Sequence, residues 1–162
     1  MGSKSDIQQG WGGCVRAALL VAEIEQRIAD AQLCVKTLTR RLGISNSYLR
    51  EVVRMNCGIS LGMLIETVRL AHAVDLMMDA KGQTLYEISK TVGYLSARTF
   101  REAFKRRLGM SPSECMRLLH ENDERCREAI AELGASLRSA QSAVLPRIFR
   151  QIFPADFSRE KR

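Results

Sequence analysis

The chain has 162 residues, of which 46% are hydrophobic and 27% charged, and its formal net charge is +7 at pH 7. These fractions are those of an ordinary soluble, globular protein, and the length allows one or two modest hydrophobic cores. No apolar run approaches the roughly 20 residues of a membrane-spanning helix, so we expect no membrane association and a cytoplasmic location.

The first segments are a tail and a packing helix. Residues 1–14 contain several Gly and Ser residues and are mostly polar apart from Ile7 and Trp11, which predicts a flexible tail. Between residues 15 and 31, apolar residues recur every fourth position and charged residues lie between them, which predicts one amphipathic helix. The apolar positions are Leu20, Ile24 and Ile28. The positions expected to face water are Glu23, Glu25 and Arg27.

The next part of the chain contains a sequence repeat. Residues 38–43 (LTRRLG) recur as 88–93 (ISKTVG), and residues 45–54 (SNSYLREVVR) recur as 96–105 (SARTFREAFK), with one extra residue in the second turn. Each copy is typical of a short helix, a glycine turn and a second helix that a serine caps. The repeat therefore predicts two helix-turn-helix units, at about 35–57 and 85–108.

A long apolar segment, residues 60–80, joins these units. Its apolar residues populate more than one helical face, which predicts a connector helix wedged between the two units. Ser111 and Pro112 then open another helix, because proline is well tolerated at a first helical position. No strand pattern competes. The predicted fold is all-α, with two helix-turn-helix subdomains, a long connector helix and a helical C-terminal extension.

The extension comprises residues 119–162. One helical seam contains Cys126, Ile130, Leu133 and Leu137, and the apolar group after Pro146 consists of Ile148, Phe149, Ile152, Phe153 and Phe157. Two interpretations remain open. The seam and the apolar group could form a docking surface for a second copy, RNA polymerase or a regulatory protein, or they could fold back on the domain's own surface.

The second helix of each unit carries the candidate functional residues. With its apolar residues inward, helical geometry places polar residues on the opposite face. The base-reading candidates are Asn46, Ser47 and Arg50 in the first unit and Ala97, Arg98 and Arg101 in the second. Arginine can pair with guanine through two hydrogen bonds, and recognition helices present their N-terminal residues to base edges. The phosphate candidates are Arg54, Lys105 and Arg106.

Two acidic residues interrupt these basic faces. Glu51 and Glu102 would repel phosphate if they lay beside DNA. Each could instead orient an arginine of the neighbouring unit, pair with a nearby helix, or accept a hydrogen bond from a cytosine amino group. The residues alone leave these alternatives open.

The excess positive charge lies on the repeat. Residues 36–117 contain 14 Lys and Arg against 7 Asp and Glu, whereas the rest of the chain has 11 of each. A basic surface attracts a polyanion and releases its counterions on binding. The charge favours a nucleic-acid partner, and an ordinary solvated surface is the alternative.

Other chemistry has no support in the sequence. The five cysteines are widely spaced without a Cys-x-x-Cys pair, and the two histidines are far apart, so we expect no disulfide framework and no metal site. No Gly-rich phosphate loop and no nucleophile with a spaced base occur. We therefore expect no cofactor and no enzymatic activity.

Five motifs stand out between residues 20 and 118: Leu42-Gly-Ile-Ser45, Gly58-Ile-Ser60, Val92-Gly-Tyr94, Phe104-Lys-Arg106 and Gly109-Met-Ser-Pro112. By these motifs, residues 20–118 resemble the DNA-binding domain of the AraC/XylS family of bacterial transcription regulators. The resemblance implies a homeodomain-like DNA-binding domain over residues 15–118, whose two units enter neighbouring major-groove segments about one helical turn apart.

The expected function is that of a sequence-specific transcription regulator, an activator, that binds double-stranded DNA in the nucleoid. Too few residues precede the first unit for an effector domain, so the chain is expected to be either a small stand-alone regulator or a fragment of a larger one, and no small-molecule effector is expected. Two alternatives remain. The scaffold could be a protein-interaction module that acts through the apolar C-terminal tail, or it could bind nucleic acid without sequence preference.

Overall fold

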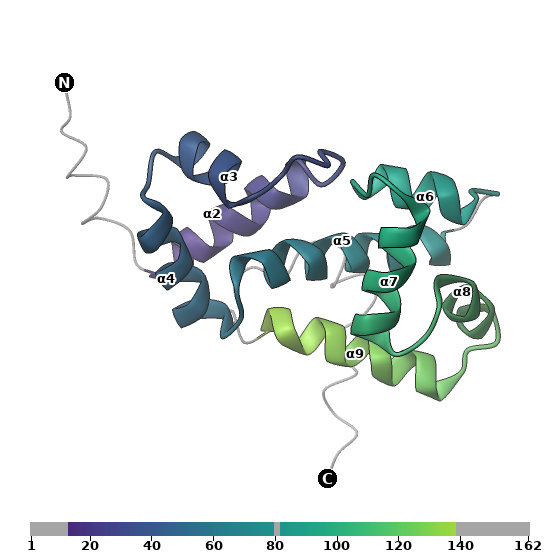
Figure 1. Ribbon diagram of the computed structural model, residues 1–162. Coiled ribbons are helices and arrows are strands. Elements are labelled where there is room, and N and C mark those ends of the chain that lie inside the picture. Colours follow the sequence, from purple (N-terminus) through teal and green to yellow (C-terminus); the bar gives the residue numbers. More distant parts are fainter. Residues whose placement is uncertain (1–12, 80–81, 139–162) are drawn as a thin grey trace, which may run out of the picture.

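The computed structural model describes residues 13–79 and 82–138, and this part of the chain contains helices and no strand (Figure 1), as predicted. The helices are α2 (Gly13–Gln26), α3 (Val35–Leu42), α4 (Asn46–Cys57), α5 (Leu61–Met78), α6 (Leu85–Thr91), α7 (Ala97–Leu108), α8 (Pro112–His120) and α9 (Glu124–Arg138). Figure 1 shows α2, α3 and α4 at one end of α5 and α6, α7 and α8 at the other. We call these groups the first and second units.

The sequence repeat is also a structural repeat. Ser45 caps α4, since its Oγ accepts the backbone N–H of Tyr48 at 3.2 Å, and Ser96 caps α7 in the same way with Thr99 at 3.1 Å. Both helices end at a glycine that serves as the C-cap. Both second helices thus begin after a serine and end at a glycine, because these two residues act on the few residues beside them.

Helix α2 ends earlier than its apolar pattern predicts. The helix stops at Gln26, so the expected continuation to residue 31 is wrong. The backbone N–H of Ile28 instead bonds to the Glu25 carbonyl three residues back, as in a tight turn. The three charged residues that were expected to face water are half-buried, and burial raises the pKa of Glu25. The segment after α2 instead contacts a distant helix, since the Asp30 carbonyl accepts a hydrogen bond from Arg69 of α5.

Helix α5 is the common core of both units. Ten of its 18 residues are buried, and they occupy several helical faces, as the sequence predicts. Each face meets a different neighbour: α5 contacts α2 and α4 of the first unit, α6, α7 and α8 of the second, and α9. The connector is therefore packed along its length rather than being a free linker.

The C-terminal helix α9 folds back onto the domain. Its apolar residues Cys126, Ile130 and Leu133 are buried, and the helix contacts α4, α5, α7 and α8. The fold-back interpretation therefore holds for these three residues of the seam, while the side chain of Leu137 and the apolar group around Phe149 lie outside what the structure describes. No described helix combines the length and the apolar character needed to span a bilayer.

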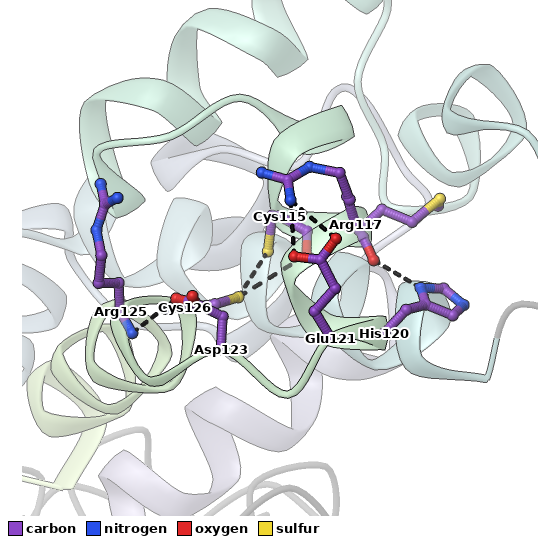
Figure 2. A network of polar contacts seen from close by, with 8 residues as sticks. Cys115, Arg117, His120, Glu121, Asp123, Arg125 and Cys126 are labelled. Atoms are coloured by element: carbon purple, nitrogen blue, oxygen red, sulfur yellow. Dashed lines mark hydrogen bonds and ion pairs between the residues drawn. The ribbon is translucent and has the colours of Figure 1, made fainter.

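The junction of α8 and α9 is apolar inside and charged outside (Figure 2). The Sγ atoms of Cys115 and Cys126 lie 3.6 Å apart, and burial raises the pKa of both thiols, so they are packing groups rather than nucleophiles. Asp123 Oδ1 accepts the backbone N–H of Arg125 at 2.9 Å and so caps α9. Among the described residues, no three His, Cys, Asp or Glu gather in a group that could hold a metal ion.

His72 on α5 is expected to make the fold sensitive to acid. Its Nε2 is buried without a hydrogen-bond partner in the described part of the chain, and burial lowers its pKa to about 4. The unfolded chain takes up this proton below about pH 6.5. The contribution of neutral His72 to stability is therefore complete above about pH 6.5 and is lost as the pH falls toward 4.

The variant His72→Gln cannot titrate and should lose less stability than the parent chain between about pH 7 and about pH 5. Urea denaturation followed by circular dichroism at both pH values measures this difference. Comparison with the parent removes the effect of other groups, such as Glu25, whose raised pKa acts in the opposite direction. An equal loss in the two proteins would contradict the role of His72.

Candidate nucleic-acid interface

Helix α4 presents a polar face opposite its buried one. Leu49 and Val53 are buried in the core. The candidates Asn46, Ser47, Arg50 and Arg54 are all exposed, as helical geometry predicts. The Arg50 Nε donates to Asn46 Oδ1 over 2.8 Å, which holds the guanidinium near the N-terminus of the helix. An arginine held in this way can offer its terminal amino groups to a pair of acceptors.

Helix α7 repeats this arrangement over a larger apolar face. Its buried residues are Phe100, Ala103, Phe104 and Leu108. Of the candidates on the opposite face, Arg98, Arg101 and Lys105 are exposed and Ala97 is half-buried. Arg101 thus occupies on α7 the position that Arg50 occupies on α4, 51 residues earlier.

One of the two acidic residues has a partner that the sequence did not indicate. Glu102 Oε1 accepts from Arg98 Nε at 2.8 Å, so the pair lies within α7 and is none of the three expected arrangements. Both side chains are more than half exposed, and an ion pair that solvent screens in this way contributes little to stability. Glu51 forms no ion pair with the residues that the structure describes. Because the ion pair of Arg98 with Glu102 is exposed and weak, Arg98 can leave it to contact another acceptor.

Two arginines near the end of α7 attach this helix to α5. Arg106 Nη2 lies 2.6 Å from Glu66 Oε2, and Arg107 Nη2 donates to Thr67 Oγ1 at 2.8 Å. Arg106, a phosphate candidate, thus carries an ion pair while its side chain stays 62% exposed. These anchors were not predicted from the sequence, although Glu66 and Thr67, two polar residues in the middle of an apolar segment, were a usable signal.

The geometry defines a class of protein. The helix pairs α3–α4 and α6–α7 have the same construction, each with exposed arginines on its second helix, and both pack on the one helix α5 or on its neighbours. Exposed basic side chains at the start of the second helix are typical of helix-turn-helix proteins that bind DNA. The fold and its basic faces are those of a tandem helix-turn-helix DNA-binding protein.

Comparisons with known proteins agree with this class. A family model described as a helix-turn-helix domain matches residues 38–118, half of the chain. The chain is 30% identical over 92 residues to the Msm operon regulatory protein of Streptococcus mutans. This match covers 57% of this chain and 33% of that protein. It is 28% identical over 95 residues to the regulatory protein SoxS of Escherichia coli K12, and this match covers 59% of this chain and 87% of SoxS. The chain thus spans only a third of the first relative.

Solved structures show the same fold. The C-terminal domain of AraT, a response regulator from Geobacillus stearothermophilus, has a TM-score of 0.59 and 26% identity over 67% of this chain and 87% of that one. A DNA-binding transcriptional dual regulator from Escherichia coli K-12 has a TM-score of 0.58 over 70% of this chain and 96% of that one, and at 21% identity it shows the fold alone.

The chain belongs to the AraC/XylS family of helix-turn-helix DNA-binding transcription regulators. The resemblance drawn from the sequence is therefore confirmed. Members of this family regulate transcription and are not enzymes.

Proposed function

We propose that the chain binds promoter DNA sequence-specifically by placing α4 and α7 in two adjacent major-groove segments, and that it activates transcription. The supporting observation is the equivalent position of Arg50 and Arg101. Both are exposed, and each follows a serine-capped helix N-terminus by about one turn. Recognition helices read bases with side chains in this part of the helix.

The proposed roles follow from the place of each residue along its helix. The residues nearest the N-termini read bases: Asn46, Ser47 and Arg50 on α4, and Ala97, Arg98 and Arg101 on α7. Those further along contact phosphates and position the units: Arg54, Lys105 and Arg106. The proposed contact with RNA polymerase or a regulatory protein is the C-terminal extension, where the apolar face of α9 is already covered and its charged face is exposed.

Selection from a randomised pool of double-stranded DNA at physiological salt tests this function. The expected result is enrichment of a bipartite motif whose halves lie about one helical turn, roughly 10 base pairs, apart. Binding without enrichment would indicate a non-specific nucleic-acid binder. An absence of binding would favour the protein-interaction alternative.

Single substitutions on the selected site then test the base-reading residues. Arg50→Ala should relax sequence preference in one half of the site and Arg101→Ala in the other, each at a cost of about 1 to 3 kcal/mol in binding free energy. Lys105→Ala is the matched control, since loss of a phosphate contact should weaken binding evenly across sequences. The base-reading assignment fails if the two arginine variants also lower affinity evenly.

A further inference from the structure

The two units touch directly on one side of α5. A Cβ added at Gly93, in the turn before α7, would lie 2.2 Å from the backbone oxygen of Ile28, which follows α2. These residues belong to different units and lie 65 positions apart in the sequence. Figure 1 shows the segment after α2 meeting the α6–α7 side of the second unit above the middle of α5. The backbones of the two units are therefore in contact with no side chain between them.

Arg69 of α5 connects the two units at this contact. Its Nη2 donates to the Asp30 carbonyl of the first unit at 2.7 Å. Its guanidinium carbon lies 5.7 Å from the ring centroid of Tyr94 in the second unit, which is within the range of a cation–π contact. Tyr94 in turn packs edge to face against Phe100 of α7, with centroids 5.3 Å apart. One side chain thus joins the backbone of the first unit to the core beneath the second recognition helix.

Helix α9 adds a second connection. It contacts α4 in the first unit and α7 and α8 in the second, and it runs along α5 on the side away from α2 and α6 in Figure 1. The buried seam of α9 is the apolar face that makes this packing possible. The connector is thus held between the Arg69 contact on one side and α9 on the other.

We propose that Arg69 is a positioning residue that fixes the orientation of α4 relative to α7, with α9 supporting the same arrangement. The inference rests on the proposed function, because the orientation of α4 relative to α7 determines which spacing of two DNA half-sites both helices can contact at once. Two rigidly joined units bind a site of one spacing with a high effective concentration of the second unit, whereas loosely joined units accept several spacings. Arg69 would then set spacing specificity without touching DNA.

The first test uses the free protein. Arg69→Met keeps the long apolar stem and removes both contacts, and it also removes an Nε that is buried without a hydrogen-bond partner in the described structure. Residual dipolar couplings from both units should fit one alignment in the parent chain and in the control Arg125→Met, an exposed arginine of α9. In Arg69→Met the two units should need separate alignments while circular dichroism stays unchanged. A single alignment in this variant would overturn the proposal.

If Arg69→Met does not fold, Arg69→Lys takes its place, since lysine keeps the charge and lacks the planar fork that reaches both partners. The result expected of Arg69→Lys, and the result that would overturn the proposal, are those stated for Arg69→Met. Either variant is read against the same Arg125→Met control.

The second test uses the selected DNA site with one or two base pairs added between its halves. The parent chain and Arg125→Met should lose about tenfold or more in affinity for the altered spacing, and Arg69→Met only about threefold or less. Equal losses in all three proteins would overturn the positioning role. If the parent chain binds no bipartite site, the proposed function fails, and the alignment result still decides whether Arg69 orients the units.

Discussion

Phe100→Ala is expected to lower the free energy of unfolding by about 3 to 5 kcal/mol. Phe100 is 1% exposed and lies between two other rings, with centroids 5.3 Å from Tyr94 and 5.6 Å from Phe104, both edge to face. The alanine variant loses the buried ring, leaves a cavity and breaks both aromatic contacts. The total free energy of unfolding of natural domains is about 5 to 15 kcal/mol. The second unit should therefore be severely destabilised.

Urea denaturation followed by circular dichroism measures this loss, and Phe100→Leu is its control. Leucine restores most of the volume and should cost clearly less than alanine, since swaps that nearly conserve volume usually cost below about 1.5 kcal/mol. The first unit has Leu49 at the equivalent buried position, which shows that leucine suits this place in the helix. A loss below about 1 kcal/mol in the alanine variant would contradict the described packing.

Gly93→Ala is expected to destabilise the protein by about 2 to 5 kcal/mol through two separate effects. Gly93 has φ 84°, a left-handed conformation that costs an L-residue about 1 to 2 kcal/mol. The new Cβ would also lie 2.2 Å from the Ile28 oxygen, so the backbone of the first unit would have to move. Overpacking of this kind typically costs about 1 to 3 kcal/mol more.

Gly109→Ala separates these two effects. Gly109 has φ 72°, and a Cβ added there meets no atom within 4 Å, so only the conformational cost applies. The difference between the two variants in urea denaturation therefore measures how closely the units approach each other. If both alanine variants are equally destabilised, the two backbones are not held in contact at Gly93.

In the candidate interface, the exposed faces could be predicted from the sequence, whereas their polar partners could not. Helical periodicity predicted the exposed face of α4 and α7, and the structure places Arg50, Arg101 and Lys105 there. The polar partners of these faces were not predicted. The pairing of Arg98 with Glu102 is one choice among several that the spacing allows, and the anchor of Arg106 on Glu66 joins residues 40 positions apart. The reading of bases by these residues remains a prediction.

The sequence by itself determined the repeated units, the bounds of their second helices and the buried connector. Serine caps, glycine C-caps and apolar periodicity act within a few residues, so these features can be read locally. Only the tertiary structure decided where α2 ends, that the seam of α9 covers α5, and that Arg69 lies between Asp30 and Tyr94. Such features depend on which distant surfaces pack together, because burial of apolar surface outweighs local helical preference.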